Sequence, residues 1–289
     1  MAWGGTGRQA VFFFTMQNPP PPSSRTACAA GIVFAMPVEA DAFAGLATET
    51  VELTAAGLTL YEGVVAGRQV AWCVGGAGGE SAGRATRLLI DGHRPQLILS
   101  PGFAGGLAPA LARGAIVYAR RSINRTGGPP IAVAATGQGA AAGAAGRATS
   151  SDGLAIVSVD AVVTTAAAKR ELAMATGASL VDMETYAVAT AARAAGLPCV
   201  SIRVISDDAS QDLPKEIAAL VQPQSGMRRL GAALAGIGRR PRAALDMWQL
   251  WEHAVVDGRT LAGAIKTFLE GLSDSPSAVS RPGSSPDRP

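Results

Sequence analysis

Acidic side chains follow three apolar segments of this sequence, and they are the residues best suited to chemistry. Glu39 comes shortly after the run AGIVFA, and Asp207 ends the run CVSIRVI. Asp182 and Glu184 lie on either side of a methionine at the end of a third run. Acidic residues are depleted in strands, although any one of them could simply cap a helix or turn. As a group they favour a shared carboxylate site.

The chemistry open to such a group is cleavage of a glycosidic bond. One carboxylic acid protonates the leaving group while a second carboxylate activates water. If the leaving group is a purine, protonation by an aspartate contributes roughly 10²- to 10⁴-fold. A carboxylate near the ribose also stabilises the positive charge that develops there. Only two histidines, His93 and His253, are present, which favours carboxylate over imidazole chemistry.

Short apolar runs alternate with helical patterns from residue 29 onward. We expect strands at 30–35, 58–65, 69–75, 96–100, 115–119, 154–159, 178–183 and 198–205, and helices at 37–46, 80–91, 164–176, 185–195 and 242–271. This alternation predicts an α/β fold, a three-layer sandwich with a mostly parallel, mixed central sheet covered by helices on both faces. In such sheets ligands bind outside the carboxyl ends of the strands, which is where the acidic residues fall.

Glycine-rich segments separate some of these elements. Residues 75–79 and the stretch PGFAGGLAP at 101–109 are expected to be corners after strands, and 124–152 is expected to be a loop. Residues 29–272 are expected to form a single domain, with the C-terminal helix included. Residues 1–28 are interpreted as a disordered extension and 273–289 as a disordered Ser/Pro tail.

Composition excludes several classes of protein. The net charge of +3 is spread along the chain, so nucleic-acid binding is not expected. Three separated cysteines form no CxxC pair, so neither a metal site nor a disulfide framework is expected, and a reduced, cytoplasmic setting fits. No run of eighteen apolar residues predicts a transmembrane segment. No cofactor is expected, because the glycine pattern from Gly76 lacks the last glycine and the acid of a dinucleotide site.

Three stretches resemble one enzyme family, in the same order along the chain. GIVFAMPVEADAF (31–43), PQLILSPGFAGGLAPALARGAIVYA (95–119) and VDMETYAVATAARAAGLPCVSIRVISDDA (181–209) are similar to segments of the methylthioadenosine/S-adenosylhomocysteine nucleosidases, members of the purine nucleoside phosphorylase/nucleosidase superfamily. The resemblance covers roughly residues 30–210. It implies a purine nucleoside as the small-molecule partner, release of adenine from a 5′-substituted adenosine, and a homodimer.

The resemblance also implies roles for single residues. Asp207 would protonate the purine, with Ser206 helping to hold it, and Glu39 would orient or deprotonate the attacking water. Glu184 would bind the ribose hydroxyls. The other residues expected at the substrate are Met183, Arg203, Gly102, Phe103, Ala104, Val162 and Val163.

Some residues depart from the family pattern. An aromatic residue usually stands near Val162, Phe103 replaces a serine, and Asp182 replaces the first glutamate of a Glu-Met-Glu triplet. The last two features are closer to the hopanoid-associated nucleoside phosphorylases, which are thought to remove adenine from adenosylhopane. The first turn, AMPVEADAF, lacks the arginine with which phosphorylases hold phosphate, so water is favoured as the nucleophile over phosphate.

Two other classes of function stay open on the sequence alone. The segment GESAG matches the G-x-S-x-G elbow of α/β-hydrolases, which would make Ser81 the nucleophile of an esterase. Gly75 to Gly78 intervene between the apolar run that ends at Val74 and this segment, and neither histidine is well placed to serve Ser81. A non-catalytic nucleoside-binding module is the remaining alternative.

Overall fold

The computed structural model describes residues 28–133, 154–213 and 241–272, with side chains from 252 onward in the last range. The predicted N-terminal extension and Ser/Pro tail therefore fall almost wholly outside the described residues, as does most of the predicted loop at 124–152.

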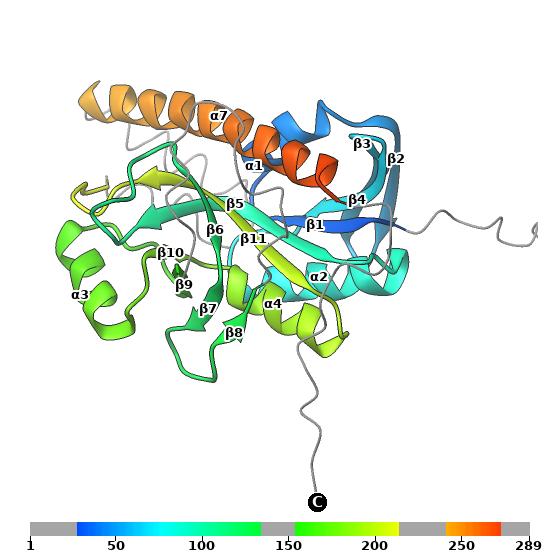
Figure 1. The fold of residues 1–289 in the computed structure, drawn as a ribbon. Coiled ribbons are helices and arrows are strands. Elements are labelled where there is room, and N and C mark those ends of the chain that lie inside the picture. The colour runs from blue at the N-terminus through cyan, green and yellow to red at the C-terminus, as the bar shows by residue number, and fades with distance from the viewer. Residues whose placement is uncertain (1–27, 134–153, 214–240, 273–289) are drawn as a thin grey trace, which may run out of the picture.

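One mixed sheet organises the described part of the chain (Figure 1). Its main path runs β2-β3-β4-β1-β5-β10-β9-β7-β8, while β11 pairs with β5 and β6. The strands are β1 (Ala30–Phe34), β2 (Thr48–Ala55), β3 (Leu58–Val65), β4 (Arg68–Val74), β5 (Ile98–Gly106), β6 (Ile116–Ala119), β7 (Arg121–Asn124), β8 (Ile131–Ala132), β9 (Ala155–Ser158), β10 (Leu180–Asp182) and β11 (Cys199–Asp207). The central strands β4, β1, β5 and β11 are mutually parallel.

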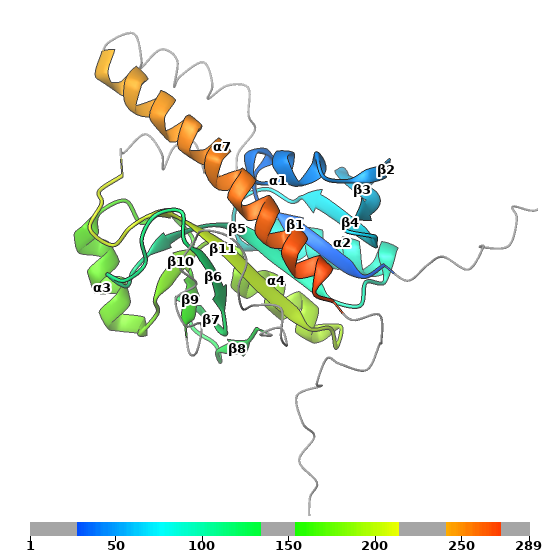
Figure 2. The same cartoon turned by 45° about the horizontal axis from the view of Figure 1, so that its top comes forward.

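Helices cover both faces of this sheet. The helices are α1 (Pro37–Ala44), α2 (Gly79–His93), α3 (Ala166–Thr176), α4 (Thr185–Ala194) and α7 (Pro241–Glu270). Helix α7 lies along α1 and crosses β11, β5 and β6 on one face, while α2 and α4 pack together on the other (Figures 1 and 2). The predicted three-layer α/β sandwich is confirmed.

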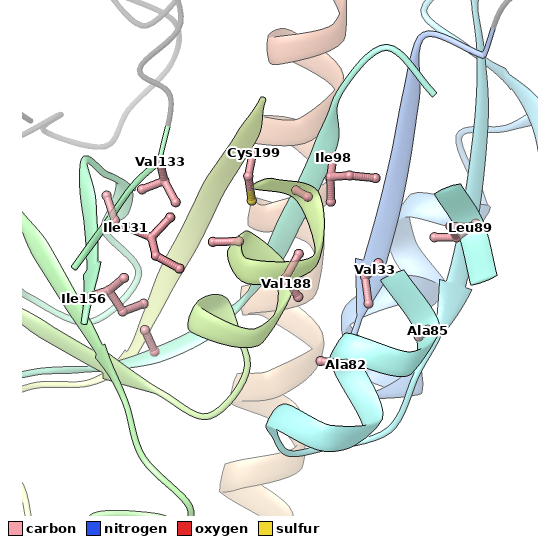
Figure 3. Packing of buried hydrophobic residues seen from close by; sticks show 14 of the residues in the cluster. Val33, Ala82, Ala85, Leu89, Ile98, Ile131, Val133, Ile156, Val188 and Cys199 are labelled. Carbon is pink, nitrogen blue, oxygen red and sulfur yellow. The ribbon is translucent and has the colours of Figure 1, made fainter. Parts of the chain in front are cut away.

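Small and branched apolar side chains fill the space between the sheet and α2 and α4. Figure 3 shows Ala82, Ala85 and Leu89 of α2 beside Val33 of β1, with Val188 of α4 close by. A Cβ at Gly75 would lie 2.7 Å from the Cβ of Ala85. The glycine thus lets α2 approach the end of β4 closely. Burial of this kind supplies most of the favourable free energy of folding.

Helix α7 buries one stripe on the opposite face. Its buried apolar side chains recur at helical spacing and are Leu261, Ala262, Ile265, Phe268 and Leu269. They pack in the same cluster as Phe34 of β1 and Ile202 of β11. Arg113 Nη2 also donates a hydrogen bond of 3.0 Å to Oδ2 of the buried Asp257, which fixes the helix to the segment before β6.

Strand β5 differs from the prediction, because it continues through the expected glycine corner to Gly106. Leu97 O accepts from Gly31 N on the β1 side, and Ile98 N donates to Pro198 O on the β11 side. Backbone groups alternate between edges along a strand, so Pro101 directs its nitrogen toward the β1 side. Strand β1 pairs only as far as Leu99. The missing N–H of proline therefore costs no ladder hydrogen bond there.

The same edge of β5 forks between two partners. Strand β1 runs parallel to its first half, and β10 runs antiparallel to its end, where Val181 lies opposite Gly105. Between Leu99 and Gly105, no strand in the described part of the chain pairs with this edge. We call this interval of β5, residues 100–104, the fork.

The strands absent from the prediction lie toward the sides of the sheet. Strand β2 is exposed along almost its whole length, but Val51, Leu53 and Ala55 alternate with polar residues, a period of two that could have identified it. Strands β7 and β8 are short, with four and two residues.

Candidate active site

Glu39 occupies the fork from the β1 side. Helix α1 begins with Pro37, which suits a first helical position, and Glu39 follows in the same turn. Its Oε2 accepts hydrogen bonds from Ala35 N at 3.0 Å and Met36 N at 2.9 Å. Its Oε1 accepts from Phe103 N at 3.0 Å, the backbone donor that the fork leaves without a strand partner. The carboxyl group is thus fixed by three backbone N–H groups.

Glu184 approaches from the face of the sheet that α2 and α4 cover. It stands just before α4, where Oε1 accepts from Gly78 N at 2.7 Å and Oε2 accepts from Met183 N at 3.3 Å. Gly78 has a φ of +94°, a conformation that L side chains rarely adopt, and this aims its N–H at the carboxylate. The predicted glycine corner after β4 therefore serves as a hydrogen-bond donor to Glu184.

Arg203 lies between these acids and is almost fully buried. Its Nη2 contacts Asp182 Oδ2 at 2.8 Å and donates to Ser100 Oγ at 2.9 Å and Thr185 Oγ1 at 2.6 Å. Asp182 is held in turn by Ser158 Oγ at 2.6 Å on its other oxygen. A buried charge that is paired and hydrogen-bonded through Nη2 in this way fixes the geometry around it, although Arg203 Nε has no hydrogen-bond partner among the described residues.

Burial and charge perturb the two glutamates. Burial raises the pKa of Glu39, and the Phe103 amide and the Arg203 charge oppose that rise. Burial also raises the pKa of Glu184 to about 7, with a further increase from the negative charge of Asp182. The Glu39 charge adds to the rise at Glu184, so the two carboxyl groups influence one another. Perturbed carboxyl groups of this kind cluster at functional sites.

Asp207 reaches the same stretch of β5 from β11. The pairing of β11 with β5 is regular up to Ile205, which lies opposite Ala104. The register then shifts: Ser206 is an extra residue, and Asp207 lies opposite Gly105. Such a bulge re-aims a side chain at the end of a strand. Asp207 Oδ1 accepts from Ser206 Oγ at 2.7 Å. The side chain lies close enough to Gly105 that a Cβ there would be 3.2 Å from Oδ2.

Lys169 completes the surroundings of Asp207 and was not predicted from the sequence. It lies on α3 with 0% of its side chain exposed, and its Nζ is 2.5 Å from Asp207 Oδ2. This contact is an ion pair; among the described residues, Oδ2 accepts no well-aligned hydrogen bond. One signal could have revealed it: Lys169 precedes Leu172 by three residues, so helical periodicity puts the lysine on the buried face.

The glycines of β5 make this crowding possible. A Cβ at Gly102 would collide with the Arg203 guanidinium and come within 3.0 Å of Glu39 Oε1. At Gly105 it would lie 3.1 Å from Val181 and 3.2 Å from Asp207. The bare backbone of β5 therefore has Glu39 and Arg203 at one glycine and Asp207 at the other.

The remaining predicted substrate residues lie around this group. Phe103 is half-buried and Ala104 is buried, and the Ala104 carbonyl is 3.3 Å from Ser206 Oγ. Val163 and Met183 are partly buried against one apolar cluster, which contains Leu107. Val162 is also half-buried, just after β9. The two valines can offer only apolar contact.

The direction of β10 corrects one element of the expected arrangement. The acids were expected at the carboxyl ends of parallel strands, but β10 is antiparallel to β5. Asp182 and Glu184 therefore reach the fork by running back along β5 from its far end. Glu39 and Arg203 therefore meet the middle of β5, whereas Asp207 lies opposite Gly105, near the carboxyl end of that strand.

The geometry supports neither Ser81 as the nucleophile of an esterase nor a metal site among the described residues. Ser81 lies in the first turn of α2, and His93 ends the same helix with its Nε2 3.1 Å from Glu62. Among the described residues, no hydrogen bond joins Ser81 to a histidine. Within the same ranges, no three His, Cys, Asp or Glu side chains are arranged to hold a metal ion.

Buried carboxyl groups with perturbed pKa values beside a central strand, between two layers of helices, are typical of an α/β enzyme. The family model of the Phosphorylase superfamily matches residues 29–235, and the chain belongs to this superfamily.

Two relatives by sequence have the same name. The chain is 37% identical over 87 residues to the 5′-methylthioadenosine/S-adenosylhomocysteine nucleosidase of Actinobacillus succinogenes, which covers 30% of this chain and 38% of that one. The chain is 33% identical over 91 residues to the enzyme of the same name from Listeria welshimeri, and the match covers 32% of this chain and 39% of that one. The matching part thus spans less than half the length of these relatives.

Solved structures share the fold over a greater length. The nucleosidase of Neisseria meningitidis, in complex with methylthio-immucillin-A, superposes with a TM-score of 0.65 at 20% identity, covering 85% of this chain and 100% of that one. The futalosine hydrolase of Helicobacter pylori gives a TM-score of 0.61 at 18% identity, covering 84% and 98%. At these identities the likeness establishes the architecture alone.

Helix α7 is long, but it does not have the composition of a membrane span. Nowhere in the described ranges is there a helix both long and apolar enough to cross a bilayer.

Proposed function

We propose that this protein hydrolyses the N-ribosidic bond of a 5′-substituted adenosine of the methylthioadenosine type and releases adenine. The observation that carries the proposal is the convergence of Glu39, Glu184 and Asp207 on β5. Glu39 is bound to Phe103 N, Asp207 lies opposite Gly105, and Glu184 is close enough to Glu39 to respond to its charge.

Each acid is suited to a different part of the reaction. Asp207 gives a proton to the purine as the bond to C1′ breaks, and the leaving base departs neutral. Glu39 orients a water molecule and takes its proton as the water oxygen attacks C1′. Glu184 accepts hydrogen bonds from the ribose hydroxyls and offsets the positive charge of the oxocarbenium-like ribose. Arg203 holds Asp182 and Thr185, and through them the turn that carries Glu184.

The charge balance favours water over phosphate as the nucleophile. Phosphate would meet three carboxyl groups, those of Glu39, Glu184 and Asp182, and among the described residues the guanidinium that pairs with this group is that of Arg203. That guanidinium already pairs with Asp182 at 2.8 Å. Since an anion is repelled by an excess of negative groups, a neutral nucleophile suits the fork better.

A panel of nucleosides tests the proposal. Purified protein is incubated with methylthioadenosine, adenosylhomocysteine, adenosine and an adenosine with a long apolar 5′-substituent, with and without phosphate, and the products are identified by mass spectrometry. Free adenine and a free 5-substituted ribose in the absence of phosphate are expected. A sugar 1-phosphate that forms only when phosphate is present would show that the reaction is phosphorolysis and not hydrolysis. Failure to release a base from every nucleoside would overturn the proposal.

A further inference from the structure

Lys169 is a buried cation beside the proposed acid, and its position is unusual for a lysine. Lysine is almost never fully buried unless its charge is paired. Here 0% of the side chain is exposed, and α3 brings it inward on the same face as Leu172. A charge in this environment must be compensated by its contacts.

All the contacts of the ammonium group are made with one short segment. Nζ lies 2.5 Å from Asp207 Oδ2 and donates to the carbonyl oxygens of Asp208 at 2.6 Å and Gln211 at 2.9 Å. The two carbonyls are neutral, so Asp207 is the group that balances the charge. The carbonyls hold Nζ at the end of β11, and the carboxylate of Asp207 meets it there.

The other oxygen of Asp207 faces a partner that can change its role. Ser206 Oγ is 2.7 Å from Asp207 Oδ1 and 3.3 Å from Ala104 O. A hydroxyl group has one proton to donate but two lone pairs with which to accept. It can donate to Ala104 and accept from a protonated Asp207, or donate to an ionised Asp207. The serine therefore fits both protonation states, whereas Lys169 favours only the ionised one.

We propose that Lys169 is a positioning residue for the acid, whose ammonium group stabilises the carboxylate that Asp207 becomes as it gives its proton to the departing base. This rests on the proposed function. In the step itself, the C1′–N bond breaks and its electron pair goes to the purine, which takes the proton of Asp207. Water bonds to C1′ and its proton goes to Glu39. Lys169 keeps all its protons throughout.

The geometry makes this stabilisation effective. The carbonyl oxygens of Asp208 and Gln211 hold the ammonium group in place whatever the charge on Asp207, so no reorganisation is needed during the reaction. Preorganised charges in water-excluded sites are among the largest contributions to catalysis, and removal of one donor typically costs about 10²- to 10³-fold in kcat. The effect applies only when the leaving group needs a proton.

The test compares two leaving groups in two matched variants. Lys169→Gln removes the charge and keeps hydrogen-bond donors for the carbonyls, while Lys169→Arg keeps the charge. Each is assayed with methylthioadenosine, whose adenine needs a proton to leave, and with 4-nitrophenyl β-D-ribofuranoside, whose nitrophenolate does not. We expect Lys169→Gln to lose about 10²-fold in kcat on methylthioadenosine, with KM changed much less. On the nitrophenyl riboside it should stay close to wild type, and Lys169→Arg should recover much of the loss.

A structural control separates charge from support. Ala166 N donates to Asp212 Oδ1 at 2.7 Å, a second link between α3 and the segment after β11. Asp212→Ala loosens this link without touching the ammonium group. If Asp212→Ala reproduces the selective loss, or if Lys169→Gln loses activity equally on both substrates, Lys169 has only a structural role. If wild type releases no adenine from any nucleoside, the proposed function fails instead, and the two failures are distinct.

Discussion

The two proposed catalytic carboxyl groups are held in opposite ways. Glu39 is fixed by three backbone N–H groups, those of Ala35, Met36 and Phe103. Asp207 is held by side chains, the Ser206 hydroxyl and the Lys169 ammonium. Backbone amides can only donate and do not titrate, whereas a hydroxyl can reverse its hydrogen bond and an ammonium carries charge.

The difference matches what each group has to do. A residue that orients water must stay in one place, and backbone donors on rigid elements provide that. A residue that starts protonated and ends ionised needs surroundings that tolerate both states. The contrast therefore predicts that lost stability has a different cause at each acid. At Glu39 a backbone N–H loses its acceptor, whereas at Asp207 the buried ammonium group of Lys169 loses its counter-ion.

The largest effect is expected for Asp207→Asn, which removes the transferable proton but preserves the shape of the side chain. The value of kcat for adenine release should fall by about 10²- to 10⁴-fold. The melting temperature should fall as well, because the buried ammonium group of Lys169 loses its counter-ion. Asp208→Asn makes the same chemical change one residue further on, at a carboxylate held by Ser210 in an exposed turn, and should keep full activity. Wild-type turnover in Asp207→Asn would show that the acid has been misassigned.

Glu39→Gln should reduce both rate and stability. One of the two carboxyl oxygens becomes an NH₂ group, which then faces a backbone donor instead of accepting from it. The lost hydrogen bond and the buried donor should cost about 1–3 kcal/mol of unfolding free energy, alongside a fall in kcat on the order of 10²-fold. Chemical denaturation and steady-state assays measure the two effects, with the exposed Glu80→Gln as control. Full stability in Glu39→Gln would contradict the contrast between the two sites.

The two glycines of β5 allow the sites to be disturbed separately. Gly102→Ala places a methyl group against Arg203 and Glu39, and Gly105→Ala places one at 3.1–3.2 Å from Val181 and Asp207. Since the collision is severe only at Gly102, its variant should lose more activity and stability, by about 1–3 kcal/mol. Gly92→Ala, a helical position with open space around it, should instead gain about 0.5–1 kcal/mol. Equal losses at 102 and 105 would argue against this account of the packing.

The smallest expected effect is a pH dependence from Glu184. Its pKa is raised from 4.5 to about 7 in the folded protein, so between these values the folded state holds a proton that the unfolded state has released. Stability should therefore fall as pH rises from about 4.5 to about 7 and then level off. Glu184→Gln has no such proton, so the melting-temperature difference between it and wild type should change across this window. A constant difference would mean that Glu184 titrates normally.

The sequence predicted the layers and most of the strands because these depend on local patterns. Strand β3 has the predicted bounds, and β1 and β11 differ from their predicted ends by one or two residues. The fork was beyond such reasoning. It depends on β10 running antiparallel to β5, a long-range pairing that no local pattern encodes. Glycine and proline in PGFAGGLAP favour a corner locally, and tertiary pairing with β11 overrides that preference.

Among the candidate site residues, the acids were found because acidic groups at strand ends are conspicuous. The residues around them were not. Lys169 stands in a run of alanines on an ordinary helix, and only its register relative to Leu172 indicates burial. Ser100 and Ser158 contact Arg203 and Asp182, but serine in a strand carries no distinctive signal. The supporting network becomes visible only when the strands are placed side by side.

At position 103 the backbone and the side chain contribute to different properties of the site. Its contribution to Glu39 is an amide N–H, which nineteen of the twenty standard amino acids provide. Side chains can therefore be varied at this position, where substrate contact is proposed, while the carboxyl group of Glu39 keeps its hydrogen bond. Proline is the one standard residue that would remove this hydrogen bond, because it has no backbone N–H. In a saturation library at this codon, the proline variant is therefore the negative control.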